Sequence, residues 1–387
     1  MLGSFPPLLR SKPVVTQKGS SLRSSLRDRL VRLIRASGPI DFAAFMDLAL
    51  YDPKEGFYAS PPVGEDGHFV TSPHVSPAFG DLVARQLAES WEALDRPRPF
   101  DLVEVGAGDG TLAVQILAAV RTVPDLAAAL RYTAVERTPG ALATLEASGL
   151  ETRGSLAEVG SVTGCVLANE VLDNLPFHRL RDRDGRTMEV FVGLEGDRLV
   201  EIEGEPTEDA IELLDRPLRP GQERPVSPAA SAMVRDLAAV LDRGYAYLFD
   251  YGFAGEVSPG PVHAYRDHRV LAEVLEEPGS RDVTAAVDLD AVAAEARRSG
   301  LLVWGPVDQR EALLGLGYRL WASGVRARQA EAEARGHWRE ANRLYAARSR
   351  ASILVDPAKL GSLRLLALGT EGLPPPAAVL GDRQTGC

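Results

Sequence analysis

The chain of 387 residues contains few residues of the types that form cross-links or metal centres. Its two cysteines, Cys165 and Cys387, are too few for a disulfide framework, and neither lies near a second ligand at metal-site spacing. The six histidines show no paired spacing, so the sequence predicts no metal site. It has no run of about 18 apolar residues, which predicts no membrane-spanning helix.

Acidic residues exceed basic ones by 11, but the excess is unevenly distributed. Residues 1–37 carry eight lysines and arginines and one acid, a formal charge of +7, so the rest of the chain carries −18. An acidic surface disfavours binding to phosphate backbones and suits a basic substrate. We therefore predict that neither a nucleic acid nor a membrane is a partner.

The two ends of the chain differ in composition from the body. Residues 1–27 are rich in serine, contain five basic residues and lack acids, and we expect a disordered basic arm. Such a segment is either a mitochondrial transit peptide or an extension without a targeting role. The low cysteine content favours a cytoplasmic protein, with the mitochondrial matrix as the alternative. The proline-rich residues 373–387 are expected to be disordered.

Between these ends, strand-like and helix-like segments alternate. Residues 28–95 predict three helices, interrupted at 52–75 by a loop rich in Gly, Pro and Ser. Residues 96–372 alternate buried strands with amphipathic helices, the pattern of a doubly wound α/β sheet. Two stretches break this pattern and are interpreted as insertions, an antiparallel meander at about 178–204 and a helical segment at about 309–350.

The stretch EVGAGDGT places Gly106, Gly108 and Gly110 at alternate positions directly after a predicted strand. A dinucleotide-binding fingerprint needs its third glycine one position later, where this chain has threonine, and the lysine of a P-loop is absent. The turn instead resembles motif I of the class I S-adenosylmethionine (SAM) methyltransferases. Glu104 before the loop and Asp109 within it would repel a phosphate but suit a sulfonium that carries an α-amino group.

Polar side chains also follow the next two predicted strands. Glu136 ends the strand RYTAVE, where an acid can accept hydrogen bonds from both hydroxyls of a ribose. Asn169 and Glu170 lie at the end of the strand GCVLAN. Because doubly wound sheets bind ligands at the carboxyl ends of their strands, we expect these side chains to face one crevice. The alternative is that the carboxylates are simply solvated.

Six longer segments extend the resemblance: GPIDFAAFMDLALYDPKEGFY, FVTSPHVSPAFGDLVA, VEVGAGDGTLAVQIL, ANEVLDNLPFHRL, AYRDHRVL and SILVDPAKLGSLRLL. Their order is similar to that of the MidA family of SAM-dependent methyltransferases, the family of a mitochondrial complex I assembly factor that methylates a protein arginine. The resemblance covers about residues 38–370. It implies a Rossmann-like sheet of seven strands with the last strand antiparallel, and SAM as the cofactor. It also implies that residues 28–95 form an N-terminal helical cap whose Thr-Ser-Pro loop closes over SAM.

The resemblance also implies roles for individual residues. The cofactor would be bound by Thr71, Ser72, Pro73, Phe79 and Gly80 of the cap, by Glu104, Gly106, Gly108 and Gly110, and by Glu136 and Asn169. Asn169, Glu170 and Asp173 would face the transferred methyl group. The chain departs from the commoner family pattern in having Ala107 for a proline, Asp109 for a basic residue and His74 for a glutamate.

Methylation of arginine makes a specific demand on the site. A guanidinium is protonated in water, so its attacking nitrogen must lose a proton. Two carboxylates can hold the guanidinium, and one of them can accept that proton. We assign Glu170 to orientation or proton acceptance, with Asp173 in support. Alternatively, Asp173 caps the turn before Pro176.

A second cluster, LFDYGF with HAYRDHR, is predicted to bind the substrate through Asp250, Tyr251, His263 and Tyr265. Tyr265 could stack on a planar guanidinium. His263 could act as a base, or it could be a structural residue.

These patterns predict an enzyme that uses SAM to N-methylate an arginine guanidinium of a protein. Free arginine or another small guanidine is an alternative substrate. A second alternative is a non-catalytic assembly or scaffold protein that retains SAM. The C-terminal helices predict either a homodimer interface or packing against the sheet.

Overall fold

A computed structural model of the chain describes residues 25–59, 71–255, 257, 259–266 and 269–381. The arm predicted at 1–27 therefore lies mostly outside the described residues, as does the middle of the loop at 52–75. Among the described residues, no helix combines the length and the apolar character that crossing a membrane requires.

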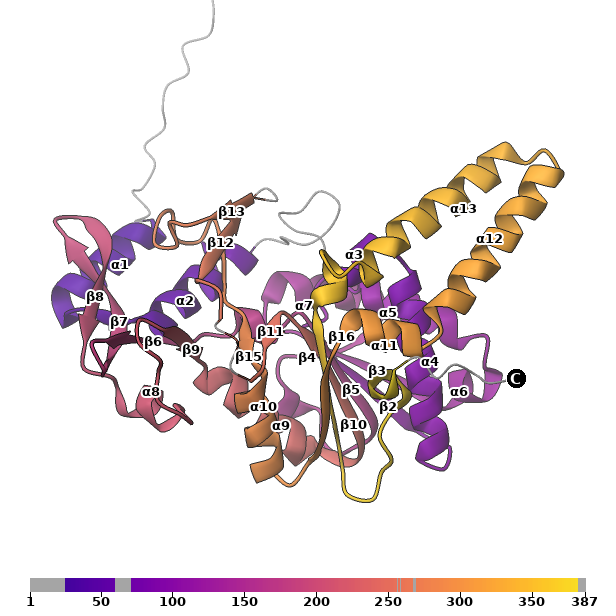
Figure 1. Ribbon diagram of the computed structural model, residues 1–387, viewed down its shortest axis with the longest axis horizontal. Coiled ribbons are helices and arrows are strands. Elements are labelled where there is room, and N and C mark those ends of the chain that lie inside the picture. Colours follow the sequence, from indigo (N-terminus) through magenta and orange to yellow (C-terminus); the bar gives the residue numbers. More distant parts are fainter. Residues whose placement is uncertain (1–24, 60–70, 256, 258, 267–268, 382–387) are drawn as a thin grey trace, which may run out of the picture.

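Seven strands form the central sheet in the order β16-β17-β10-β5-β2-β3-β4 (Figure 1). Neighbouring strands are parallel except at β17, which is antiparallel to both β10 and β16. The predicted Rossmann-like sheet with an antiparallel last strand is thereby confirmed. The strands are β2 (Phe100–Val105), β3 (Leu130–Val135), β4 (Glu151–Arg153), β5 (Val162–Asn169), β10 (Leu241–Asp250), β16 (Leu302–Asp308) and β17 (Arg364–Gly369).

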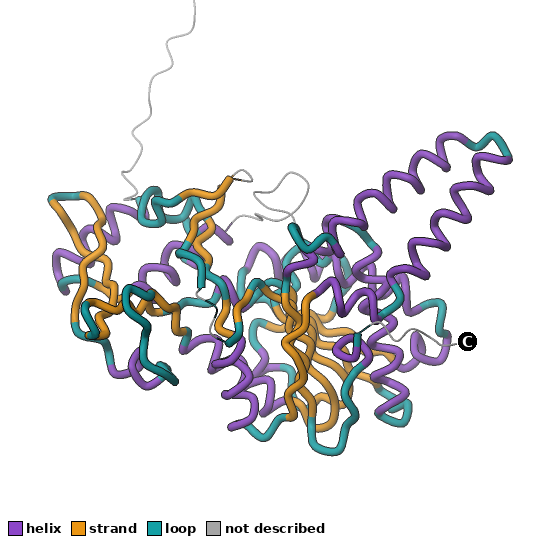
Figure 2. Tube along the Cα trace, viewed as in Figure 1, coloured by secondary structure: helices purple, strands orange, loops and turns teal. Residues whose placement is uncertain are grey.

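Helices cover both faces of this sheet, so its strands carry apolar side chains on both sides (Figure 2). Leu102 and Leu365 lie in one core, while their neighbours Val103 and Leu366 lie in the other, because successive strand residues point to opposite faces. The first core includes residues of α4 (Ala78–Ala93), α5 (Thr111–Val120), α6 (Pro124–Ala129), α7 (Pro139–Ala147), α11 (Gln309–Gly315) and α14 (Ala377–Leu380). The second includes residues of α9 (Pro228–Val240) and α10 (Leu289–Arg298).

Three segments that are distant in the sequence form a second lobe beside the sheet (Figure 1). A third hydrophobic core joins them, with Phe42, Phe177, Val192 and Ala264 among its buried members. The segments comprise α1 (Leu26–Ser37), β1 (Ile40–Asp41) and α2 (Phe42–Tyr51); β6 (His178–Arg183), β7 (Arg186–Glu195), β8 (Arg198–Gly204), α8 (Glu208–Glu212) and β9 (Glu223–Val226); and β12 (His263–Arg266), β13 (Arg269–Leu271) and β14 (Asp282–Thr284). The short strands β11 (Gly252–Phe253) and β15 (Val287–Asp288) pair where the chain enters and leaves the third segment.

The predicted domain boundaries need correction at two places. Residues 28–95 do not form one cap, because α1 and α2 pack in the second lobe while α4 packs on the central sheet. The meander extends past its predicted end at 204, because β9 pairs with β6. Helix α1 begins at Leu26, where Ser25 and Asp28 form a capping box.

The C-terminal region also differs from the prediction. Within the predicted 309–350 insertion, α11 packs in the core, whereas α12 (Tyr318–Ala334) and α13 (Trp338–Ala351) form an antiparallel hairpin that projects from the body (Figure 1). The expectation of disorder from residue 373 is wrong for 373–381. Leu373 and Ala378 are buried, and the side-chain oxygen of Gln86 accepts a 2.9 Å hydrogen bond from the Ala378 amide.

Candidate functional site

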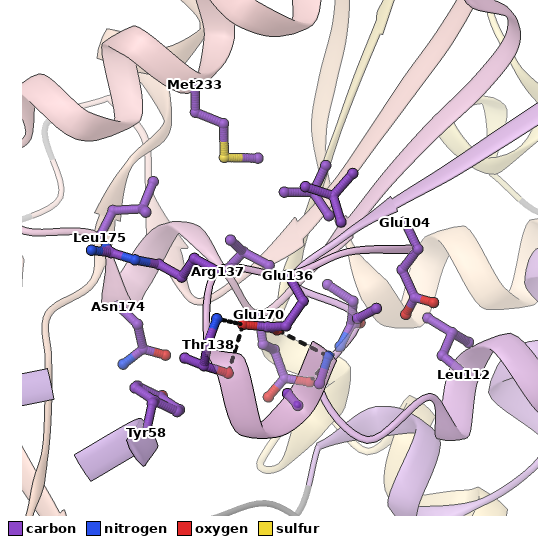
Figure 3. A pocket seen from close by; sticks show the side chains of 18 of the residues that line it. Tyr58, Glu104, Leu112, Glu136, Arg137, Thr138, Glu170, Asn174, Leu175 and Met233 are labelled. Atoms are coloured by element: carbon purple, nitrogen blue, oxygen red, sulfur yellow. Dashed lines mark hydrogen bonds between the residues drawn. The ribbon is translucent and has the colours of Figure 1, made fainter. Parts of the chain in front are cut away.

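A cavity of about 510 Å³ opens at the carboxyl ends of β2, β3 and β5. Its walls combine the glycine loop, the residues that follow β3 and β5, helix α9, and two tyrosines of the second lobe (Figure 3). This volume is in the range of cavities that bind drug-sized ligands and cofactors. The sequence-predicted residues that line it are Thr71, Pro73, Glu104, Gly106, Gly108, Glu136, Asn169 and Glu170.

The glycine loop has a left-handed backbone at each of its three glycines. The φ angles are 70° at Gly106, 55° at Gly108 and 80° at Gly110, a region that residues with a Cβ rarely adopt. A Cβ on Gly106 would also lie 2.6 Å from a methyl carbon of Val171. The predicted spacing therefore reflects a conformation that glycine alone adopts without strain, and the loop ends where Gly110 caps α5.

Glu136 lies in the cavity wall, directly after the end of β3. One carboxylate oxygen accepts hydrogen bonds from the Thr138 amide at 2.9 Å and its hydroxyl at 3.0 Å, and the other accepts one from the Gly108 amide at 3.2 Å. The carboxylate thus lies beside the glycine loop, and its contact with ribose hydroxyls stays a prediction.

Glu104 lies at the base of the cavity and is only 3% exposed. Burial raises its pKa to about 8, the negative charges of Asp109 and Glu136 add to this effect, and a hydrogen bond from the Tyr132 hydroxyl opposes it. A buried carboxyl group with so high a pKa becomes ionised more readily when a cation approaches. An α-amino group of a bound cofactor would provide that cation.

Asn169 and Glu170 lie together at the end of β5. The Asn169 amide nitrogen donates a 3.1 Å hydrogen bond to Glu170 Oε1, which also accepts one from the Ser72 amide at 3.1 Å. Glu170 has a φ of 56°, and its own amide donates to the Phe249 carbonyl at 2.7 Å. Burial raises the pKa of Glu170 to about 7. The side-chain oxygen of Asn169, Oδ1, is buried and has no hydrogen-bond partner among the described residues.

Asp173 and Asp250 are buried next to Glu170 and do not line this cavity. Asp250 accepts hydrogen bonds from the amides of Val171 and Leu172, at 3.0 and 2.7 Å, so it holds the turn that follows β5. Asp173 accepts a 3.0 Å hydrogen bond from the Thr284 hydroxyl, while its second oxygen lacks a partner among the described residues. Burial raises the pKa of Asp173 to about 6 and holds that of Asp250 well above its usual range.

Other predicted substrate residues lie around these carboxyl groups. Tyr251 is 41% exposed. Its pKa is raised by burial and by the negative charges of Glu170 and Asp173. Tyr265 is half-buried, and its ring contacts that of His263 edge-on at 6.3 Å between centroids. None of the four residues predicted to bind the substrate is in the cavity wall, and their role stays a prediction.

Four of the residues predicted to bind the cofactor do not line the cavity: Ser72, Phe79, Gly80 and Gly110, the last of which caps α5. Phe79 is fully buried and packs edge-on against Phe249, and Gly80 lies where a Cβ would be 2.3 Å from the Cβ of Gln115. Both residues pack α4 against the sheet and α5 instead of lining the cavity. Ser72 is also behind the wall, where its hydroxyl donates to Gln309 Oε1 at 3.2 Å.

The sequence analysis missed a group of residues from the second lobe. Tyr51 and Tyr58 stack with 5.4 Å between ring centroids, and both line the cavity. The buried Asp282 accepts hydrogen bonds from the Tyr58 hydroxyl at 3.3 Å and the Asn174 amide at 2.8 Å. Burial raises the pKa of Asp282 to about 7. The only sequence signal was the pair of tyrosines in LALYDPKEGFY.

His74 and Asp109, two of the residues that depart from the commoner family pattern, contact each other. His74 Nε2 lies 3.0 Å from Asp109 Oδ2, and His74 Nδ1 lies 2.8 Å from the Thr71 hydroxyl oxygen. The contact connects two segments of the cavity wall, the short helix α3 (Ser72–Val75) and the glycine loop.

The described residues fit SAM. Glu136 is placed for hydroxyl groups, and the unpartnered Asn169 oxygen requires a hydrogen-bond donor that a ligand can supply. Leu156 and Met233 provide an apolar wall, which suits a planar base. The cofactor would be held by these residues together with the backbone of the glycine loop.

Comparisons with known proteins agree with this assignment. Residues 82–307 match the model of a family of S-adenosyl-L-methionine-dependent methyltransferases. The mitochondrial protein arginine methyltransferase NDUFAF7 homolog of Drosophila melanogaster is 32% identical over 394 aligned residues, which cover 92% of this chain and 87% of that protein. Human mitochondrial NDUFAF7, also named a protein arginine methyltransferase, is 39% identical over 89 residues, 23% of this chain and 20% of that protein.

Solved structures show the same architecture. The structure of a candidate methyl transferase from Burkholderia thailandensis with bound S-adenosyl-homocysteine has a TM-score of 0.79 and 26% identity, and the match covers 93% of this chain and 95% of that one. A native structure from the same organism has a TM-score of 0.76 and 25% identity, with the same coverage. The chain therefore belongs to the MidA family of SAM-dependent methyltransferases.

Proposed function

We propose that this enzyme transfers a methyl group from SAM to a guanidinium nitrogen of an arginine in a protein. One observation carries the choice of acceptor. Three buried carboxyl groups and the partly buried carboxyl group of Glu170 lie around the end of β5, and no ion pair found among the described residues joins any of the four to a lysine or arginine. They are Glu170, Asp173, Asp250 and Asp282.

Buried carboxylates without a basic partner are unfavourable, so their pKa values rise and they attract a cation. A guanidinium supplies a delocalised positive charge and five N–H donors in a planar fork. The unpartnered oxygen of Asp173 is free to accept one of these donors. The names of the curated relatives, which are protein arginine methyltransferases, support the same acceptor.

Glu170 has the properties of the proton acceptor. Burial raises its pKa to about 7, so at neutral pH it is partly ionised and can still take a proton from the attacking nitrogen. The amides of Ser72 and Asn169 hold one of its oxygens in a fixed position. SAM, when bound, supplies a methyl group on a sulfonium, so the protein's own task is to align the nitrogen and remove its proton.

A side chain of a protein fits this site better than a free amino acid. Tyr251 directly follows the buried Asp250 and is 41% exposed, so the surface of the protein lies close to this group of carboxyl side chains. A residue carried on a polypeptide could enter there while SAM occupies the cavity. Free arginine would leave its own carboxylate close to Asp173 and Asp282, and like charges repel.

The curated relatives are mitochondrial by name. This fits the mitochondrial alternative for the location of the chain, and the cytoplasmic location predicted from composition has no support from them. The residues predicted as a targeting segment lie almost entirely outside the described part of the chain. The homodimer predicted from the C-terminal helices remains a prediction.

The first experiment is a calorimetric titration of SAM into wild type, Glu136→Ala and Glu146→Ala. Glu136→Ala removes the two hydrogen bonds that the ribose hydroxyls of SAM would donate to this carboxylate. Each is worth about 1.5–3 kcal/mol, so the affinity for SAM should fall by about a hundredfold or more. Glu146→Ala is the matched control. Glu146 is exposed and accepts a hydrogen bond from the Thr152 hydroxyl, and we expect its replacement to leave the affinity for SAM unchanged.

Transfer is then measured with labelled SAM on arginine-containing peptides, their lysine counterparts and free arginine. Label on the arginine peptides alone supports the proposal. Label on free arginine at an equal rate would favour the small-molecule alternative. Binding of SAM without transfer to any acceptor in a cell lysate would favour the scaffold alternative.

A further inference from the structure

A relay of three side chains connects helix α3 to the glycine loop. The Thr71 hydroxyl lies 2.8 Å from His74 Nδ1, and His74 Nε2 lies 3.0 Å from Asp109 Oδ2. The other oxygen of Asp109 accepts a 2.9 Å hydrogen bond from the Thr111 amide at the start of α5. We call Thr71, His74 and Asp109 the clasp.

The remaining contacts of α3 lead to other parts of the protein. The Ser72 amide donates to Glu170, and the Ser72 hydroxyl donates to Gln309. The Pro73 carbonyl accepts a 2.8 Å hydrogen bond from the Gln115 side chain. Among the described residues, His74 provides the side-chain hydrogen bond between α3 and the glycine loop. Its loss would leave Asp109 held only by Thr111.

The clasp lies in an acidic environment. Burial alone would raise the pKa of Asp109, but hydrogen bonds from His74 and Thr111 hold it below its usual value. The negative charge of Asp109 contributes to the raised pKa of Glu104. An ionised carboxylate only accepts hydrogen bonds, so His74 Nε2 carries the hydrogen in its 3.0 Å contact with Asp109.

We propose that His74 is a positioning residue that acts through Asp109 to hold the glycine loop in its cofactor-binding conformation. The backbone of that loop has left-handed φ angles at three glycines, so it has little intrinsic preference for this shape. An external hydrogen bond to Asp109 reduces the number of conformations that the loop can adopt, and preorganisation of this kind strengthens binding. The inference rests on the cofactor site and is independent of the methyl acceptor.

The test uses the full chain and the calorimetric affinity for S-adenosyl-homocysteine, which needs no acceptor. His74→Leu removes the N–H donor, and His74→Gln keeps one. We expect affinity to fall about tenfold or more in the first variant and to stay within about threefold of wild type in the second, since a charge-assisted hydrogen bond is lost only in the first.

A charge reversal provides an independent measurement. His74→Glu places two carboxylates opposite each other and Asp109→Arg removes the acceptor, so each single variant should bind about tenfold or more weakly. The double variant His74→Glu with Asp109→Arg restores an ion pair of opposite polarity and should recover most of the loss. His337→Glu creates the same like-charge contact with Glu340 on the exposed α13 hairpin and should leave affinity unchanged.

Thermal melting of each variant separates loss of fold from loss of the clasp. Wild-type affinity in His74→Leu, or a double variant that binds no better than the weaker single variant, would overturn the proposal. Failure to methylate arginine would not, because that result concerns the acceptor only.

Discussion

Glu170→Gln is the substitution that most directly tests the assignment of the proton acceptor. The glutamine oxygen can still accept the hydrogen bonds from the Ser72 amide and the Asn169 side chain, and the side-chain shape is retained. The charge and the capacity to take a proton are lost. We therefore expect S-adenosyl-homocysteine affinity to change little and kcat to fall by about 10²–10⁴-fold, the usual contribution of a general base.

The pH dependence follows from the raised pKa of Glu170. With a pKa of about 7, roughly a tenth of the carboxyl groups are ionised at pH 6 and most are ionised at pH 8. The kcat/KM of wild type should therefore rise about tenfold per pH unit below pH 7 and become constant above it. In the complex with a cationic guanidinium, the pKa falls, so the profile of kcat should be displaced to lower pH.

The assay is methyl transfer to an arginine peptide between pH 5.5 and 8.5, with Glu146→Gln as an exposed control. A variant that retains kcat within about threefold of wild type would refute a role for Glu170 in proton transfer. A flat profile for wild type would refute the link between the Glu170 carboxyl group and the reaction.

Two further predictions concern stability. Gly80→Ala should lower the free energy of unfolding by about 1–3 kcal/mol in denaturant titrations, because the new Cβ would lie 2.3 Å from the Cβ of Gln115. Gly324 is a helical glycine with open space around it, so Gly324→Ala should instead raise the free energy of unfolding by about 0.5–1 kcal/mol. Equal effects of the two substitutions would contradict the packing argument. The pKa of Glu104 rises from 4.5 to about 8 on folding, so the folded protein keeps a proton that the unfolded chain has lost. The contribution of Glu104 to stability is complete below about pH 4.5 and declines as the pH rises to about 8. Glu104→Gln should remove that decline in the free energy of unfolding. An unchanged pH dependence in the variant would contradict the raised pKa of Glu104.

The features that the sequence determined by itself are local. Glycines at positions 106, 108 and 110 predict a loop with left-handed backbone, because residues with a Cβ disfavour that conformation. Glu136 and Glu170 were predicted from their positions just after buried strands, since the carboxyl ends of parallel strands meet at one edge of the sheet. Alternating apolar segments likewise predict the order of strands and helices.

Contacts between distant segments were decided by the tertiary structure. Asp282 joins Tyr58 and Asn174, residues more than 100 positions away in the chain, because three separate segments pack into one lobe. Phe79 and Gly80 face the core instead of the cofactor because of the close approach of α4 to α5. The contact between His74 and Asp109 likewise depends on where α3 rests on the glycine loop. Local periodicity fixes which face of an element is apolar, but only packing of the whole chain decides which side chains meet across the site.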